Sequence, residues 1–250
     1  MAADAGIILA PGRVPAGERI YAIGDVHGCV EQLATLHALI ADDLDDRPIG
    51  AATLIHLGDL VDRGPDSAAV VELVGTPPLA SRAEITGRIN LMGNHERMML
   101  DALVEATPDA ASHWLENGGD RALRSWGASP RRPARTWVEA IPPGHVGLLV
   151  GLSLSARIGD YLFAHAGVRP GRPLAQQSAD DLIWIREPFL SHAGPLGLGE
   201  GAPTVVVHGH TPVRDPTVLA NRIGIDTGAV IGGRLTCAVL EGATLRFIFA

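Results

Sequence analysis

The sequence predicts an α/β fold, and three observations support that prediction. The chain has 250 residues, of which 46% are hydrophobic, enough for a sizeable core and too many for a disordered chain. In the first half, short apolar strands run into glycine-rich loops that are followed by helical patterns. The second half consists mainly of short strands separated by glycine turns. Because no linker or repeat of fixed period divides the chain, we expect one domain over residues 18–250 and an extended lead-in over residues 1–17.

Three strand–loop–helix units follow one another in the first half. Their strands are predicted at residues 19–23, 52–57 and 89–92, and their helices at residues 30–44, 67–73 and from the third loop to about residue 104. Five later strands are predicted at residues 161–164, 204–207, 222–226, 235–240 and 244–249, the last two joined by a hairpin at Glu241 and Gly242. Residues 106–143, rich in arginine, tryptophan and proline, are predicted to form a helical insertion with loops.

Composition excludes several classes of protein. All 20 positions that hold lysine or arginine hold arginine, so the essential lysines of P-loop NTPases, Schiff-base enzymes and pyridoxal phosphate enzymes have no counterpart. The formal charge of −8 disfavours nucleic acid as the main partner, because phosphate backbones demand a basic face. Neither of the two cysteines, Cys29 and Cys237, begins the Cys-x5-Arg loop of a cysteine-based phosphatase.

The same sequence features predict a cytoplasmic protein. Two cysteines cannot build a disulfide framework, which indicates a reducing compartment. The first 17 residues lack the basic region of a signal peptide, and no stretch approaches the roughly 18 apolar residues of a membrane span. We therefore expect no membrane partner.

Five loops, each after a predicted strand, carry aspartate, histidine or asparagine beside glycine. In chain order they read GDVHG from Gly24, GDLVDRG from Gly58, GNHE from Gly93, HAG from His165 and HGHTP from His208. Oxygen and imidazole nitrogen are ligands that suit Mn, Fe or Zn, and the chain offers no set of thiolates. One such loop would be ordinary turn chemistry, but five in order, at the strand ends where α/β folds build their sites, indicate a metal centre.

These motifs resemble those of the calcineurin-type metallophosphoesterases and, more narrowly, of the bacterial PPP-type serine/threonine protein phosphatases. They occur in that family's order and span residues 24–212. The resemblance implies a four-layer αββα sandwich with two central mixed β-sheets, in which residues 18–250 form a single catalytic domain. It also implies two divalent metal ions between the sheets, with Mn²⁺ the first expectation and Fe or Zn the alternatives.

The resemblance assigns six side chains as ligands of the two metal ions. In chain order they are Asp25, His27, Asp59, Asn94, His165 and His210. The first two would hold one ion, Asp59 would bridge both, and the last three would hold the second ion. A hydroxide between two ions about 3.5–4 Å apart would attack phosphorus directly, so no side-chain nucleophile is needed.

Four further side chains complete the site that the resemblance implies. His95 resembles the general acid that protonates the departing oxygen, and Asp62 resembles the carboxylate that orients this histidine. Arg63 and Arg186 resemble two phosphate-binding guanidiniums, whose planar fork suits an oxyanion. Asn94 is expected to contact the phosphate as well as a metal ion.

Other candidates receive structural interpretations. His208 is expected to lie at a strand end beside the site rather than to bind metal, and His56 to be packed or hydrogen-bonded locally. Cys29 is expected to be a buried structural cysteine next to the first metal loop. Asp226, in an Asp-Thr-Gly segment, is predicted to belong to a turn.

Three functions remain open. The first is hydrolysis of phosphoserine and phosphothreonine in phosphoproteins or phosphopeptides, the second is hydrolysis of a dinucleoside tetraphosphate such as diadenosine tetraphosphate, and the third is a non-catalytic scaffold. Asp62 and Glu96 favour the first, because the tetraphosphatase branch tends to lack the former carboxylate and to read GNHD in its third motif. The Asp-Thr-Gly segment at Asp226 favours the second. A scaffold would have lost ligands, and here every mapped position is filled.

Overall fold

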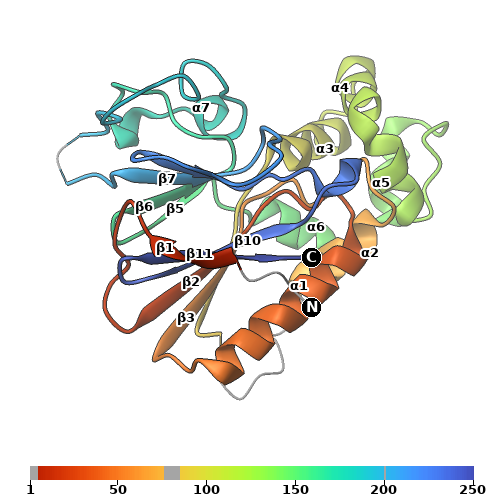
Figure 1. The fold of residues 1–250 in the computed structure, drawn as a ribbon. Helices are drawn as coiled ribbons and strands as arrows, with labels where there is room; N and C mark the ends of the chain where they lie inside the picture. The colour runs from red at the N-terminus through yellow and green to blue at the C-terminus, as the bar shows by residue number, and fades with distance from the viewer. Residues whose placement is uncertain (1–4, 76–84, 200) are drawn as a thin grey trace.

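Two β-sheets stacked face to face form the centre of the molecule (Figure 1). The computed structural model describes residues 5–75, 85–199 and 201–250. Within them, the first sheet has six strands in the order β1-β11-β10-β2-β3-β4, and the second has five in the order β5-β6-β7-β9-β8. The helices lie outside this pair of sheets.

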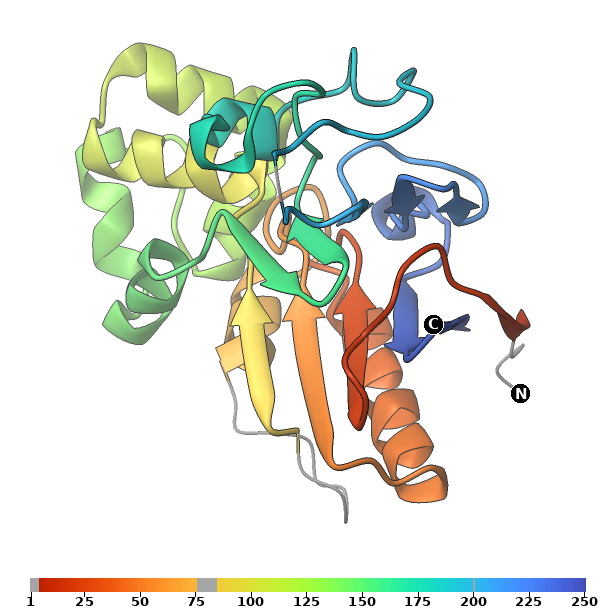
Figure 2. The ribbon, with the colours of Figure 1, turned by 90° about the vertical axis from the view of Figure 1, so that its left-hand side faces the viewer.

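Both sheets mix parallel and antiparallel pairs, as predicted. The first sheet contains β1 (Ala5–Leu9), β2 (Glu18–Ile23), β3 (Ala51–His56), β4 (Gly87–Asn90), β10 (Thr236–Glu241) and β11 (Thr244–Phe249). The second contains β5 (Ser155–Ile158), β6 (Tyr161–Ala164), β7 (Val205–His208), β8 (Thr217–Val218) and β9 (Arg222–Gly224). Strands β2, β3 and β4 run parallel, so their carboxyl ends meet at one edge (Figure 2).

Helices of the first half cover the outer face of the first sheet. In α1 (Val30–Asp46), the buried side chains Leu33, Leu36, Ile40 and Leu44 recur at helical spacing and form one apolar stripe. The stripe packs with α2 (Ser67–Gly75), α3 (Asn94–Val104) and α6 (Pro143–Val150) in one apolar core against the sheet. The remaining short helices are α4 (Pro108–Trp114), η1 (Leu115–Gly119), α5 (Asp120–Ser125), η2 (Ala134–Ala140), η3 (Leu174–Gln176), α7 (Ala179–Ile183) and η4 (Ala229–Ile231).

Successive side chains along each strand point to opposite faces of the sheet, and this divides the apolar core into two parts. On β2, Tyr21 and Ile23 face the helices, whereas Ile20 and Ala22 face the second sheet. On β6, Phe163 packs between the sheets and Leu162 packs on the opposite, outer face. The central strands of both sheets are therefore buried on both faces, which explains why β2, β6 and β7 are short and largely apolar runs.

The fourth layer differs in character from the first. The outer face of the second sheet is covered by α7 and by largely irregular chain between residues 166 and 199, which together form a third, smaller core (Figure 1). The predicted four-layer αββα arrangement is confirmed, with loops supplying most of this last layer.

Most predicted elements are found within two residues of their predicted bounds, and the hairpin of β10 and β11 at Glu241 is confirmed. Strands β1, β5 and β8 and helix α6 were not predicted, because each is short and borders turn residues. Strand β1 lies in the segment expected to be an extended lead-in and pairs with β11. Of the described helices, none has both the length and the apolar character needed to cross a bilayer.

Candidate metal centre and active site

The backbone of the motif loops adopts an uncommon conformation. Among the described non-glycine residues, six have a positive φ angle. Five of these are predicted site residues, namely His27, Asp59, Asp62, Arg63 and His210. Such residues are strained, persist only where the surrounding structure holds them, and cluster at functional sites.

Two motif glycines allow the backbone to approach the carboxylates closely. A Cβ atom added to Gly93 would lie 2.1 Å from Oδ1 of Asp59, and one added to Gly209 would lie 2.0 Å from Oδ1 of Asp25. No side chain fits at either place, which is why these loops need glycine beside the polar residues.

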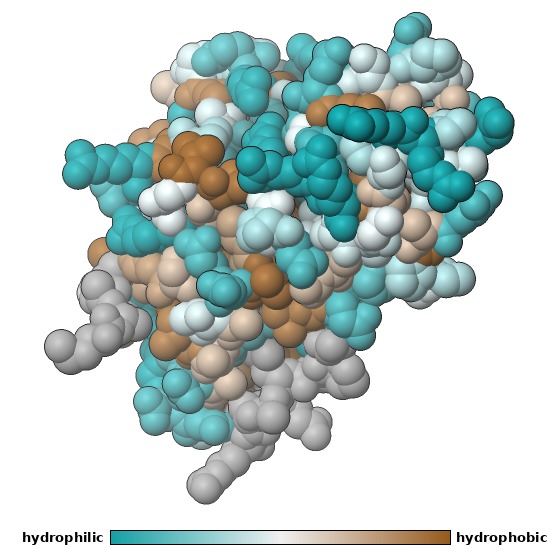
Figure 3. Space-filling view, turned by 90° about the vertical axis from the view of Figure 1, so that its right-hand side faces the viewer, coloured by the Kyte–Doolittle hydropathy of each residue, from teal (hydrophilic) through white to brown (hydrophobic). Residues whose placement is uncertain are grey.

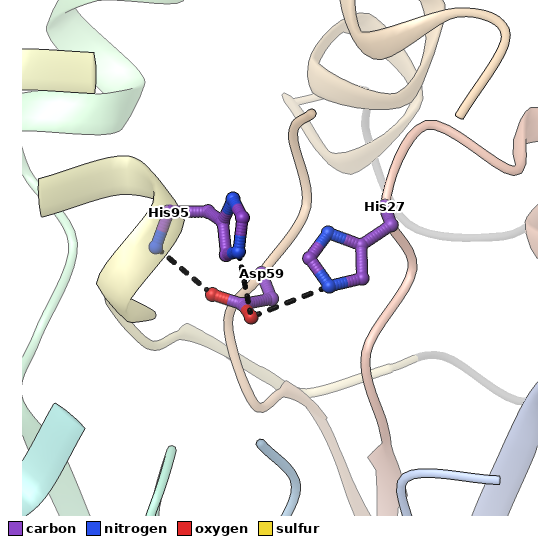
Figure 4. A group of neighbouring side chains, drawn as sticks. All are labelled: His27, Asp59 and His95. Carbon is purple, nitrogen blue, oxygen red and sulfur yellow. Dashed lines mark hydrogen bonds and ion pairs between the residues drawn. The ribbon is translucent and has the colours of Figure 1, made fainter. Parts of the chain in front are cut away.

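His27, Asp59 and His95 form the first group of potential metal ligands (Figure 4). Nε2 of His27 lies 3.4 Å from Oδ2 of Asp59. Nδ1 of His27 lies 2.9 Å from the carbonyl oxygen of Val61, which can only accept, so Nδ1 carries the proton and Nε2 offers its lone pair to the site. Burial lowers the pKa of His27 to about 4, although the charge of Asp59 opposes the shift. A neutral imidazole is the form that binds metal.

Asp59, His165 and His210 form the second group. Nδ1 of His165 donates to the carbonyl oxygen of Leu57 at 3.0 Å, which leaves Nε2 3.3 Å from Oδ1 of Asp59. Oδ1 of Asn94 lies 3.0 Å from Nε2 of His165 and 2.9 Å from Nδ1 of His210. Asp59 belongs to both groups, as a bridging ligand requires, and Asn94 contacts both histidines of the second.

Negative charge accumulates around Asp25. Its carboxylate accepts a hydrogen bond from the backbone N–H of His210, at 3.1 and 3.0 Å to the two oxygens. Burial, together with the nearby charges of Asp226 and Asp59, raises the pKa of Asp25 well above its ordinary value. Buried carboxylates that repel one another and face imidazoles fit divalent cations, which would neutralise them. The oxygen and nitrogen donors suit Mn, Fe or Zn.

His95 is held at one ring nitrogen and unpaired at the other. Nδ1 lies 2.7 Å from Oδ2 of Asp62, whereas Nε2 is buried without a hydrogen-bond partner, 4.0 Å from Oδ2 of Asp59. Trp114, on α4, donates its indole N–H to both oxygens of Asp62, at 2.9 and 3.0 Å. Burial raises the pKa of Asp62 to about 6, against the effect of His95. The structure thus joins Asp62 and His95, as the sequence predicted, and directs Nε2 of His95 toward the carboxylate shared by the two groups.

Both predicted phosphate-binding arginines lie exposed at the rim of the site. Nη1 of Arg63 lies 3.1 Å from Nε2 of His27, and Arg63 also borders a cavity of about 450 Å³ lined by Arg121 and Ile231. Arg186 lines a cavity of about 540 Å³ together with Trp184. The pKa of His210 is lowered to about 3, mainly by burial, then by the charge of His165 and to a smaller extent by the Arg186 guanidinium.

Glu96 has a positioning contact that the sequence analysis missed. Its buried carboxylate accepts four backbone hydrogen bonds, from Asp59 at 2.9 Å, Leu60 at 2.7 Å, Val61 at 3.1 Å and Gly93 at 2.8 Å. It therefore ties the second motif loop to the third. Glu96 belongs to the GNHE motif, but no local pattern indicates that its side chain reaches the backbone of the second motif loop.

Trp114 was also missed, because the insertion that contains it shows no clear periodicity.

His208 hydrogen-bonds the carbonyl of Gly209 at 3.1 Å and packs edge-on against Phe189. It belongs to neither ligand group, as expected of a strand-end residue. Asp226 accepts from the N–H of Gly228 at 3.0 Å, as expected in a turn, yet it is buried and its charge acts on Asp25. Asp226 is thus also part of the site's electrostatics.

Comparison with known proteins decides the family. The calcineurin-like phosphoesterase family model matches residues 18–235, most of the chain. The chain belongs to the calcineurin-like phosphoesterase family. Its motif loops are therefore those of a hydrolase that uses divalent metal, in agreement with the donor groups at the strand ends.

Relatives of this calcineurin-like phosphoesterase include protein phosphatases and dinucleoside tetraphosphatases. It is 30% identical to serine/threonine-protein phosphatase 1 of Salmonella typhimurium over 225 residues, which cover 89% of this chain and 92% of the relative. It is also 30% identical to the bis(5'-nucleosyl)-tetraphosphatase PrpE (asymmetrical) of a Geobacillus species over 241 residues, covering 87% and 89%. Among solved structures, a candidate diadenosine tetraphosphatase superposes with a TM-score of 0.63 and 25% identity, covering 96% of this chain and 98% of the other.

Proposed function

We propose that this phosphoesterase is a metal-dependent phosphomonoesterase that removes phosphate from phosphoserine and phosphothreonine in proteins or peptides. The hydrogen-bonded pair of Asp62 and His95 carries this proposal, because it leaves Nε2 of His95 free beside the ligand groups. Serine and threonine leave as poor alkoxides, and a positioned acid contributes roughly 10²–10⁴-fold to such a departure.

Two divalent ions, Mn²⁺ first among them, fit the site. When bound, they would supply Lewis-acid charge to the phosphate and lower the pKa of water to near neutrality. The side chains proposed to hold them are Asp25, His27, Asp59, Asn94, His165 and His210. The backbone carbonyls of Leu57 and Val61 fix the tautomers of two of these histidines, so that each presents Nε2.

The remaining roles follow from the contacts of each residue. His95 would hold the proton at Nε2 and give it to the leaving oxygen. Asp62 accepts from Nδ1, which fixes the ring orientation and stabilises the charged imidazole, and Trp114 holds Asp62 in place. Arg63 and Arg186 would bind the phosphate oxygens through their guanidinium forks. Asn94 is proposed to contact the phosphate as well.

A direct comparison of substrates tests the proposal. With Mn²⁺, we expect kcat/KM to be higher for a phosphothreonine peptide than for diadenosine tetraphosphate. A tenfold or larger preference for the dinucleotide would overturn the protein-phosphatase proposal. Absence of hydrolysis of both, in metal-loaded protein, would instead support a scaffold.

Hydrolysis of a dinucleoside tetraphosphate is the second candidate. It is favoured by the similarity to the candidate tetraphosphatase, which extends over 96% of this chain and 98% of the other. The indole of Trp184, which is 38% exposed and lies edge-on to the His210 ring at 6.2 Å, offers a nucleobase a surface for stacking. If this candidate were correct, Trp184→Ala would lower kcat/KM for the dinucleotide far more than for p-nitrophenyl phosphate.

A further inference from the structure

Another cavity lies within the insertion (residues 106–143), and none of the motif residues lines it. Its volume is about 460 Å³, within the range of small-molecule sites. It is bordered on one side by the start of α4 and on the other by the loop that leads into η2. Figure 3 shows the face of the molecule on this side, where strongly hydrophilic side chains gather over the upper part beside smaller hydrophobic areas.

The wall of this cavity combines apolar surface with cations. Leu115 and Pro133 are among its apolar residues, and Arg132 and Arg135 are its charged ones. Both arginines are exposed, and neither guanidinium has a hydrogen bond or ion pair with the described residues. No acidic residue lines the cavity in the described part of the chain. Although the protein has a net charge of −8, the cavity wall is therefore locally basic, and no acidic side chain in it neutralises the two arginines.

Trp137 adds an independent observation. Its side chain lines the cavity and is only 2% exposed, yet its indole N–H has no partner among the described residues. A buried donor that lacks an acceptor carries a desolvation cost, so such groups in native proteins normally meet an acceptor. Two free guanidiniums and one free indole N–H are all donors, and an oxyanion supplies only acceptors.

The cavity is also connected to the hydrogen-bonded pair of Asp62 and His95 through aromatic contacts. The ring of Trp137 packs edge-on against that of Trp114, with centroids 5.8 Å apart. Trp114 is the residue that donates to Asp62, and Asp62 holds His95. The ring of Trp114 therefore lies between Trp137 in the cavity wall and Asp62, which holds His95.

We propose that this cavity is an effector site for a small organic anion, an apolar body carrying a carboxylate or phosphate. The oxyanion would accept from Arg132, Arg135 and the indole N–H of Trp137, while the apolar body packs on the proline and leucine side chains. Binding there would alter the packing of Trp137 on Trp114.

Indole N–H resonances provide the test, since the chain has only four tryptophans. Benzoate is the probe and benzamide its neutral isostere, both titrated into ¹⁵N-labelled protein. Trp137→Phe and Trp114→Phe assign the two signals. We expect benzoate to shift the Trp137 and Trp114 signals with the same midpoint, and benzamide to bind at least tenfold more weakly. Equal binding of benzamide, or no shift of either signal, would overturn the proposal.

Arginine variants locate the binding. Arg132→Gln and Arg135→Gln should each weaken benzoate binding by roughly threefold or more, in keeping with a partly exposed charge pair. Arg131→Gln is the matched control, because Arg131 is exposed and adjacent but does not line the cavity. If the Trp114 shift persisted in the Arg132→Gln, Arg135→Gln double variant, benzoate would be acting at the catalytic site and the effector assignment would be wrong. The titration needs no phosphatase turnover, so it can fail or succeed independently of the proposed function.

Discussion

Two groups of buried histidines differ in what surrounds them. Nε2 of His37 on α1 lies 3.1 Å from Nε2 of His56 on β3, and Nδ1 of His56 lies 2.8 Å from Oδ1 of Asn90. This pair joins a helix to the sheet, and no carboxylate is among its contacts or the causes of its pKa shifts. At the candidate metal centre, by contrast, His27, His165 and His95 all lie around the carboxylate of Asp59.

At the candidate metal centre the pKa shifts of the buried histidines differ in direction, because the pKa of His27 falls to about 4, as at the His37–His56 pair, whereas that of His165 rises. Burial lowers the pKa of His37 to about 4 and that of His56 to about 3. Burial also acts to lower the pKa of His165, but the charge of Asp59, the hydrogen bond to Asp59 and the charges of Asp25 and Glu96 together outweigh burial and raise this pKa to about 10. Burial alone therefore does not separate the two groups of histidines, whereas convergence of three histidines on the shared carboxylate of Asp59 indicates a place for a cation.

The largest effect is expected at the shared carboxylate. Asp59→Asn should lower both metal content and kcat, because one residue serves both ligand groups. Both losses should exceed the roughly 10–100-fold cost of removing a side chain that only hydrogen-bonds to a metal ligand. Metal content is measured by mass spectrometry and kcat with p-nitrophenyl phosphate in Mn²⁺. His37→Leu is the control and should change neither quantity. If the Asp59→Asn variant kept its metal content, the claim that the Asp59 carboxylate makes this histidine group a metal site would be wrong.

A smaller effect is expected at the unpaired nitrogen of His95. His95→Asn should lower kcat on a phosphothreonine peptide by roughly 10²–10⁴-fold while metal content stays unchanged. With an aryl phosphate, whose leaving oxygen needs little protonation, the loss should shrink. If metal content fell instead, His95 would be a ligand of the first group. An equal loss across leaving groups of different pKa would show that His95 only positions the substrate.

The smallest effect concerns stability rather than catalysis. Because the pKa of His37 is about 4 when folded and near 6.5 when unfolded, the unfolded chain binds more protons between these values. The free energy of unfolding should therefore fall as pH drops through 6.5 toward 4, by on the order of 3 kcal/mol for this residue alone.

Urea unfolding with a chelator present, at several pH values, measures this loss. In the His37→Leu, His56→Leu double variant the dependence on pH should be shallower than in the parent chain. His113→Gln, at an exposed position, should leave the slope unchanged. A double variant with the same slope as the parent would show that the pair is not the acid-sensitive element.

Local patterns were sufficient to predict the α/β class and the five polar motif loops at strand ends, whereas the roles of individual site residues came from the family resemblance. Each strand–loop–helix unit can be recognised within about 25 residues, because apolar runs, glycines and helical periodicity are all short-range signals. The sandwich architecture came from the resemblance, which rests on five motifs in order. Short strands such as β5 and β8 were not predicted, because pairing with partner strands defines them more than their own residues do.

The sequence by itself determined which polar side chains sit at strand ends, because strand and loop alternate along the chain and parallel strands end at one edge. Only the tertiary structure decided which partners those side chains acquire. Glu96 reaches the backbone of residues 59–61, and Trp114 reaches Asp62 across 52 positions. His37 meets His56 only because α1 packs on β3. These contacts join residues far apart in the chain, so no local pattern encodes them, and they exist only once the layers have packed.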